Sequence, residues 1–195
     1  MSTKERILEE ALTLFSERGY DGVGIDEIAA HVGIKGPSIY KHFKSKEEIL
    51  EVLIDNAEAR YDELFGSEIN VGQIPENKIG FIKSTMERIS FTIHDPMIRK
   101  IRILLVQEQF RGERYAEVTT KHQLLGIQKM YSRILSEMMD RGLIIRDEPE
   151  MLALELAGPV VLMVARADRE PQLADEILED IEEHLEHFCR IYMKE

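Results

Sequence analysis

Apolar residues recur every three or four positions along nearly the whole chain, which is the spacing of amphipathic α-helices. Ile7, Leu8, Ala11, Leu12, Leu14 and Phe15 follow this spacing in the first predicted helix. No window alternates between apolar and polar residues convincingly, so the pattern predicts no strands. We therefore expect an all-α fold of about nine helices.

Start and stop signals divide the pattern into separate helices. Ser2-Thr3-Lys4-Glu5 and Ser45-Lys46-Glu47-Glu48 are candidate capping boxes. Gly19 is placed to end the first helix in a left-handed conformation, and Gly142 is a second candidate stop. Asp95-Pro96 is a typical cap-then-proline start.

These signals predict two short helices, over 25–32 and over Pro37–Phe43, before the longer helix that Ser45 opens. The segment 66–75 carries two glycines and one proline and is the best candidate for a loop or linker. Further helices are predicted over 76–93, 96–111, 115–141, 149–169 and 171–193.

The two short helices have the outline of a helix-turn-helix, with Gly33-Ile34-Lys35-Gly36 as the turn. The second of them is the element that would enter a major groove and read base edges. Ile39 and Phe43 are spaced to pack inward, which leaves other side chains facing outward. The outward-facing side chains are Ser38, Lys41 and His42, and the Tyr40 hydroxyl could donate to a phosphate. Lys44 and Lys46 flank the start of the next helix, where free backbone N–H groups also attract phosphate. For His42, burial against Phe43 or against the first helix is the alternative.

The overall charge argues against a nucleic-acid partner, because 37 acidic residues outnumber 25 basic ones and the formal net charge is -12. The excess is local, however. Residues 1–46 hold seven Lys or Arg and seven Asp or Glu, so all of the excess belongs to 47–195. The segment His31–Lys46 contains four lysines and no acid. A small basic patch therefore coincides with the predicted reading helix.

The stretch Gly19–Leu50 resembles the DNA-binding region of the TetR (tetracycline repressor) family. The family pattern is matched at Gly19-Tyr20, Ile28-Ala29, Gly33, Ser38-Ile39-Tyr40, His42-Phe43 and Ser45-Lys46-Glu47. The remainder is similar only in length and helical character. The resemblance implies a three-helix DNA-binding domain over 1–47 and an effector-binding and dimerisation domain over 48–195.

The resemblance also implies DNA contacts, position by position. Phosphate contacts fall to Tyr40 and Lys46, and the groove-facing positions are Lys35, Gly36, Pro37, Ser38, Lys41 and His42. The family usually has threonine or serine where this chain has Val23 and Gly24. Gly24 remains a predicted DNA-binding position and can still cap the first short helix, but it offers no hydroxyl for a phosphate. This departure bears on the operator sequence and not on the docking mode.

Other chemistries are less well supported. The G-I-K-G turn also fits the loop of a KH RNA-binding domain, but that fold needs strands. No nucleophile with a base, phosphate loop or paired carboxylates is visible, so we expect no enzyme and no cofactor. His184 and His187 have a spacing that could ligate a metal, although an ion pair such as Asp180 with His184 is the simpler interpretation, and no metal site is predicted. Cys189 is expected to be a small packing residue.

The last two helices are the predicted dimer face. The helix over 149–169 is apolar almost all round and must be covered on every side. The final helix carries an apolar stripe at Leu173, Ile177, Ile181, Leu185, Phe188 and Tyr192. Two such helices from each subunit would form a four-helix bundle. The alternative is a monomer core, and the resemblance favours the homodimer.

The middle helices are the predicted effector pocket. Ile103, Gln107 and Phe110 share one face, as do Val118, His122 and Leu125. Gln107 and His122 would orient a ligand in a mostly apolar site. The alternative is that both edge the core or bond to backbone.

Together these features predict a homodimeric transcriptional regulator, a repressor that a small apolar or amphipathic effector releases from a palindromic double-stranded DNA operator. The alternative is a helical small-molecule-binding or interaction protein without operator binding, suggested by Val23-Gly24 and the acidic body. One cysteine, a charged N-terminus and the lack of an apolar run of membrane-spanning length predict a soluble cytoplasmic protein.

Overall fold

The computed structural model describes residues 1–65 and 74–194. Within these residues the regular structure is helical, apart from an isolated bridge between Ile144 and Met193. The all-α prediction is therefore confirmed. Residues 66–73 of the predicted loop lie outside the described residues. Of the helices that the structure describes, none has both the length and the apolar character that a membrane span requires.

The chain forms two compact units. The first unit comprises Met1–Leu64 and Lys100–Thr119, and the second comprises Phe65–Arg99 and Thr120–Glu195. The first unit thus contains the whole of the predicted DNA-binding domain together with two further segments. The domain boundary at residue 47 stays a prediction.

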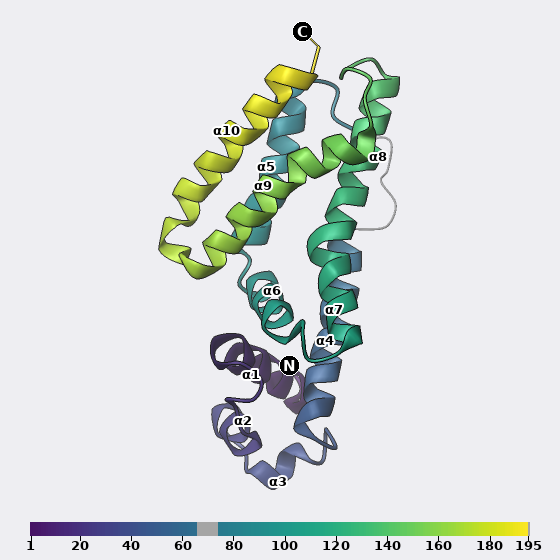
Figure 1. The fold of residues 1–195 in the computed structure, drawn as a ribbon. Helices are drawn as coiled ribbons and strands as arrows, with labels where there is room; N and C mark the ends of the chain where they lie inside the picture. Colours follow the sequence, from purple (N-terminus) through teal and green to yellow (C-terminus); the bar gives the residue numbers. More distant parts are fainter. Residues whose placement is uncertain (66–73, 195) are drawn as a thin grey trace. The chain divides into compact units, whose positions relative to one another are not determined.

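The first unit is built from α1 (Thr3–Arg18), α2 (Ile25–Val32), α3 (Gly36–Ile39) and α4 (Lys46–Phe65), with most of α6 (Pro96–Glu108) and of α7 (Glu113–Thr120). Figure 1 shows α1, α2 and α3 grouped beside the first half of α4. Tyr115 on α7 donates a hydrogen bond to the Glu51 carboxylate on α4, and Arg114 pairs with the same carboxylate. These contacts hold α7 against α4.

The helix ends follow the predicted signals closely. The Ser2 hydroxyl accepts from the Glu5 amide at 3.2 Å, and the Glu5 carboxylate accepts from the Ser2 amide at 2.7 Å, so the first capping box is present. Gly19 has a positive φ of 74° but a ψ of 158°, which is not the left-handed helical conformation predicted for it. Gly142 has the positive φ expected of a stop. Asp95 caps α6 by accepting from the Met97 and Ile98 amides.

The second unit contains α5 (Lys78–His94), α8 (Gly126–Asp140), α9 (Pro149–Arg169), the 3-10 turn Pro171–Leu173 and α10 (Ala174–Tyr192). Its core is one apolar cluster drawn from these four α-helices and from Ile74 and Ile144. The helix predicted over 115–141 is continuous but includes a π-helical turn, Lys121–Leu125. A Cβ on Gly126 would lie 2.7 Å from the Lys121 carbonyl oxygen, so the turn closes against a residue without a side chain.

The apolar stripe of α10 lies in this core. Ile177, Ile181, Leu185 and Phe188 are all buried there. The chain buries these four residues by itself, as in the monomer-core alternative, whereas Leu173 and Tyr192 of the same stripe are half-buried. The homodimer through the last two helices stays a prediction. On α9, by contrast, Met151 (54%), Leu154 (50%) and Leu162 (73%) remain exposed.

Candidate nucleic-acid interface

Helices α1, α2 and α3 share a small core that fixes the helix-turn-helix. Ile28, Val32, Ile39 and Phe43 are buried, as their spacing predicts. Arg6 on α1 donates to the Val32 carbonyl oxygen at the end of α2. Because this arginine satisfies a carbonyl that the helix itself leaves open, it ties α1 to the turn.

The turn between α2 and α3 begins at Gly33, which is left-handed with φ 77° and ψ 31°. Its amide and that of Ile34 bond to the Ala30 and Ala29 carbonyl oxygens. This is the glycine-terminated helix end that a tight turn requires. The chain can then reverse within three residues and start α3.

The second helix of the motif is shorter than predicted. An α-helix over Pro37–Phe43 was expected, but α3 runs from Gly36 to Ile39. The Lys41 and His42 amides bond three residues back, to Ser38 and Ile39, and the Phe43 amide bonds four residues back to Ile39. The segment thus continues as tighter turns, which carry Phe43 into the core.

The residues predicted to contact DNA lie on the outer surface of this segment. Most of them are exposed, namely Gly24, Lys35, Pro37, Tyr40, Lys41, His42 and Lys44. Gly36, Ser38 and Lys46 are half-buried. The exposure of His42 excludes the alternative in which it packs against Phe43. Whether these residues touch DNA stays a prediction.

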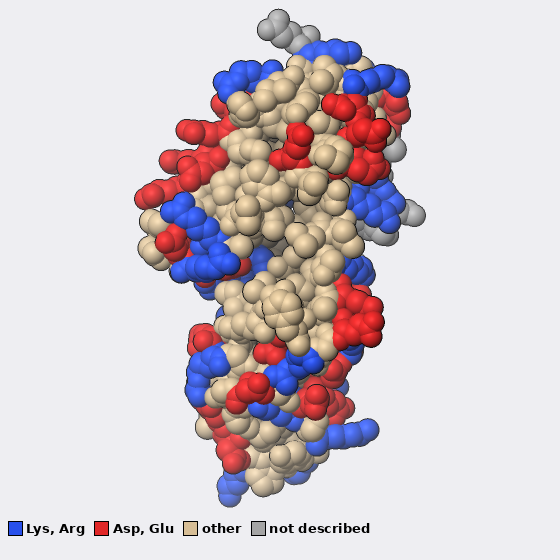
Figure 2. All heavy atoms as spheres, in the orientation of Figure 1, with Lys and Arg blue, Asp and Glu red and all other residues tan. Residues whose placement is uncertain are grey.

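The charge of the first unit supports this surface. In Figure 2, Lys or Arg atoms flank the end of the unit at which α3 lies. In the second unit, acidic side chains follow the outer edge of α10. The exposed acids of α10 are Asp175, Glu176, Glu179, Asp180, Glu182, Glu183 and Glu186. An anionic duplex would be attracted to the first surface and repelled by the second.

Lys46 differs from the other basic residues because its side chain is engaged within the protein. Its Nζ donates hydrogen bonds of 2.9 Å to the carbonyl oxygens of Tyr20 and Val23. It also lies 4.0 Å from the centroid of the Tyr20 ring. The neighbouring Ser45 hydroxyl accepts from the Glu48 amide, and the Glu48 carboxylate accepts from the Lys44 amide rather than from Ser45. In the second capping box the carboxylate therefore bonds to the amide one residue before the N-cap serine.

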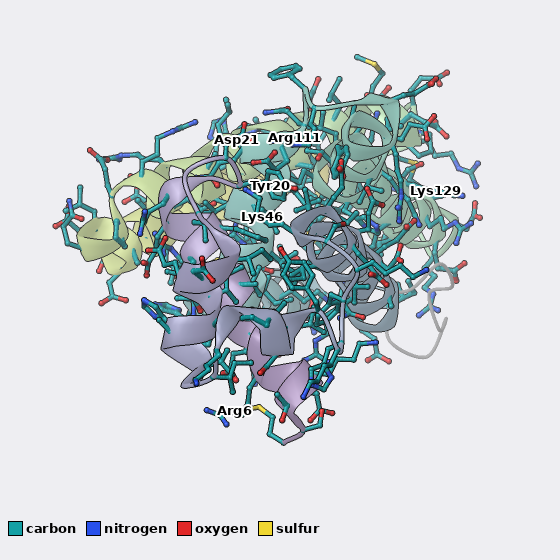
Figure 3. The ribbon with its side chains drawn as sticks, turned by 90° about the horizontal axis from the view of Figure 1, so that it is seen from below. Arg6, Tyr20, Asp21, Lys46, Arg111 and Lys129 are labelled. Carbon is teal, nitrogen blue, oxygen red and sulfur yellow. The ribbon has the colours of Figure 1, made fainter. Side chains whose placement is uncertain are left out.

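A cluster around Tyr20 joins the helix-turn-helix to the end of α6. The Tyr20 amide donates to Glu108 at 3.3 Å, and Arg111 donates to Glu108 at 2.5 Å and to Asp21 at 3.0 Å. The Arg111 guanidinium also lies 4.3 Å from the Tyr20 ring centroid. Figure 3 shows Tyr20 between Arg111 and Lys46. The sequence pattern does not predict this cluster, because its partners are about ninety positions apart.

Two further bonds hold α6 along α1. Lys100 donates to the Thr13 hydroxyl at 2.9 Å, and Gln107 donates to the Ser16 carbonyl oxygen at 3.2 Å. Gln107 was a candidate ligand anchor, and its bond to backbone matches the alternative interpretation. Its contacts hold two helices together.

The other predicted pocket residues have mixed environments. In the first unit Val118 is buried, Ile103 is half-buried and the Phe110 side chain is 91% exposed. In the second unit His122 is half-buried and Leu125 is exposed. Their role in effector binding stays a prediction.

The histidines near the C-terminus make structural contacts. His184 donates to the Leu156 carbonyl oxygen at 3.0 Å, and His187 accepts from Arg190 at 2.8 Å. Asp180 pairs with Arg166 and not with His184. Among the described residues there is no group of three His, Cys, Asp or Glu side chains that could hold a metal ion. Cys189 is buried, and burial raises the pKa of its thiol to about 11.

Comparison with known proteins points to the same segment. Residues 7–53 match the family model described as "Bacterial regulatory proteins, tetR family". The chain is 34% identical over 135 residues to IcaR of Staphylococcus aureus, the negative transcriptional regulator of the icaADBC biofilm operon. This match covers 66% of the chain and 69% of IcaR. IcaR of Staphylococcus epidermidis is 29% identical over 128 residues, covering 49% of the chain and 68% of that protein.

Solved structures share the fold over the full length. SmeT, the repressor of a multidrug efflux pump of Stenotrophomonas maltophilia, aligns with a TM-score of 0.70 at 21% identity over 100% of this chain and 92% of its own. The complex of SmeT with triclosan aligns with a TM-score of 0.72 at 20% identity, over 100% of this chain and 93% of the SmeT chain. A regulator from Saccharomonospora viridis in complex with choline gives 0.70 at 16% identity over 98% of each chain. At these identities the likeness concerns the fold.

Proposed function

The chain belongs to the TetR family of bacterial regulatory proteins and is a helix-turn-helix transcriptional regulator, and from this premise we propose that it is a repressor that a small effector releases from a palindromic operator. Regulators of this family are transcription factors and not enzymes.

The observation that carries operator binding is the exposed surface of α3 and the turn after it. Lys35, Lys41 and Lys44 are exposed there, and no acid occurs between His31 and Lys46. Ser38, Lys41 and His42 are the candidates for reading base edges, because side chains near the start of a recognition helix face the groove. Repression is supported by IcaR, which is a negative regulator.

Release by an apolar or amphipathic molecule is supported by SmeT, whose fold this chain shares and which was solved with triclosan. The candidate contacts are those of the middle helices: Ile103, Gln107, Phe110, Val118, His122 and Leu125. If the effector bound the conformation that does not bind the operator more tightly than the other by about 1–3 kcal/mol, it would weaken operator binding roughly 5–150-fold.

Pairing of two chains would be mediated by the last two helices, α9 and α10, and chiefly by α9. Its exposed Met151, Leu154 and Leu162 form apolar surface that a second copy would cover. A dimer also supplies a second recognition helix, which an operator with half-sites about one DNA turn apart, ~34–36 Å, would accept.

Selection of duplexes from a random pool by the full chain, followed by affinity measurements at fixed salt, tests this function. We expect the selected duplex to bind at least about a thousandfold more tightly than a scrambled one. Equal affinity for both would exclude specific regulation. A dimer that retains no duplex even at low salt would support the alternative, an interaction protein without operator binding.

A further inference from the structure

Lys46 is the lysine for which the family pattern implies a phosphate contact, yet its ammonium group is bound inside the first unit. An ammonium has three N–H donors. Two of them are used by the carbonyl oxygens of Tyr20 and Val23, each at 2.9 Å. The aromatic face of Tyr20, 4.0 Å away, is a further partner for the positive charge.

The two carbonyls lie at either end of the short segment that leads from α1 into α2. Val23 is 2% exposed, and the next residue, Gly24, is the N-cap of α2. Gly24 has no side chain with which to cap the helix. The start of α2 is therefore fixed from outside, by the lysine at the first position of α4.

Arg111 holds the same segment from another side. It lies 4.3 Å from the Tyr20 ring centroid and bonds to Asp21, the residue after Tyr20. Glu108, which accepts from Arg111, also accepts from the Tyr20 amide. In Figure 3 the four labelled residues Lys46, Tyr20, Asp21 and Arg111 form one group. Residues 20–23 are thus held by the Lys46 ammonium and by the Arg111 guanidinium.

Lys41 and Lys44 contrast with Lys46. Both are exposed, and within the described residues neither side chain makes a hydrogen bond or an ion pair. Their ammonium groups can reach a phosphate without breaking an internal contact. Lys46 has one N–H donor left, and moving its ammonium outward to a phosphate would break two charge-assisted hydrogen bonds.

We propose that Lys46 is a positioning residue, which sets the start of α2 for docking on DNA, and that the phosphate contacts at this edge come from Lys41 and Lys44. The inference rests on the proposed DNA binding. It reverses the role that the family pattern implies for this lysine.

Lysine acetylation of the unaltered protein, quantified by mass spectrometry with and without a selected duplex, tests the proposal without any substitution. We expect Lys46 to react at least about tenfold more slowly than Lys44 in the free protein, because its amine is hydrogen-bonded and half-buried. The duplex should protect Lys41 and Lys44 and leave the rate at Lys46 unchanged. Rapid acetylation of Lys46 that slows when the duplex is bound would overturn the proposal.

The salt dependence of binding provides a second, independent test. Lys44→Ala should lower the slope of log affinity against log salt by about 0.9 for each phosphate that the lysine no longer neutralises. Lys46→Met, which keeps the apolar stem, should weaken binding about tenfold at fixed salt but keep the slope. It should also speed hydrogen exchange at residues 20–25. If Lys46→Met lowered the slope as much as Lys44→Ala does, Lys46 would be a phosphate contact and not a positioning residue. Absence of binding by the unaltered protein would instead refute the proposed function, whereas the acetylation rates of the free protein still report on Lys46.

Discussion

Gly36, the first residue of α3, lies directly against the side chain of Asp26 in the first turn of α2. A Cβ on Gly36 would lie 2.0 Å from Asp26 Oδ1, well inside any permitted contact. The two helices of the motif therefore meet at a position that accepts only glycine while Asp26 keeps its conformation. The family resemblance implies that Gly36 faces the groove, and the packing provides a separate reason for its identity.

Substitution of Gly36 by alanine should destabilise the first unit and weaken DNA binding. The new methyl group forces the Asp26 side chain to rotate, and because that side chain is exposed and flexible, the cost should be about 1 kcal/mol, the low end for overpacking. We expect the free energy of unfolding in urea to fall by that amount. The double variant Gly36→Ala/Asp26→Ala should recover most of it, because the obstructing carboxylate is gone.

Gly24→Ala is the matched control. A Cβ at Gly24 would meet nothing within 4 Å, and its φ of −98° suits any residue. Since alanine is a poorer N-cap than glycine, it should cost about 0.5 kcal/mol without any steric contact. Equal urea midpoints for Gly36→Ala and Gly24→Ala would show that the contact with Asp26 is unimportant.

Glu108 should be far more sensitive to neutralisation than an acid of a surface pair. Its side chain is nearly buried and accepts from both the Tyr20 amide and Arg111. Hydrogen bonds to charged groups contribute about 1.5–3 kcal/mol each. We expect Glu108→Gln to lower the free energy of unfolding by about 1–3 kcal/mol in a urea titration.

Glu137→Gln tests whether this loss is specific. Glu137 pairs with Arg141 one helical turn away at a partly exposed site of α8. Pairs of this kind contribute about 0.3–0.5 kcal/mol. Similar losses for the two variants would mean that Glu108 does not hold Tyr20 and Arg111 together.

Periodicity and helix-end signals were sufficient to predict α1, α2, α4 and α9 closely, because local sequence decides where such helices begin and end. The length of α3 was not predictable in the same way. Ile39 and Phe43 have helical spacing, yet the Lys41 and His42 amides between them bond three residues back, as in tight turns. Either geometry would bury both side chains, so the hydrophobic pattern does not distinguish them.

Roles that depend on distant residues were beyond the pattern. Lys46 lies in a basic stretch, and only the fold brings its ammonium to the Tyr20 and Val23 carbonyls. The stripe of α10 similarly indicates that a face is buried, but not whether the same chain or a second copy buries it. Exposed positions such as Lys41 and His42 were placed correctly because they sit between the buried Ile39 and Phe43.

Cys189 should be unreactive in the folded protein. Burial raises the pKa of its thiol from 9.0 to about 11, so the thiolate that reacts with iodoacetamide is scarce at pH 9. Alkylation of the native chain at pH 9 should be much slower than alkylation in urea. The neutral thiol also links stability to pH. Its contribution is fully present below pH 9 and is lost toward pH 11, because the unfolded chain ionises first.

Cys189→Ala removes this titration and serves as the control for the pH dependence. Between pH 9 and pH 11 its free energy of unfolding should decline less steeply than that of the unaltered protein. Equal alkylation rates in the native and the unfolded chain would show that Cys189 is accessible and not part of the core.

Leu162→Lys should convert the protein to a monomer. Leu162 is the most exposed of the apolar residues on α9, at 73%, and a lysine there would place one charge from each subunit in the proposed interface. Because association stabilises the folded dimer, the urea midpoint of the variant should be lower than that of the unaltered protein and independent of protein concentration. Sedimentation velocity should show half the mass. Operator affinity should fall, since one chain alone reads one half-site.

Ile79→Lys, at an equally exposed isoleucine on α5, should leave the dimer intact. If Leu162→Lys sediments as the unaltered protein does, α9 is not the dimer face.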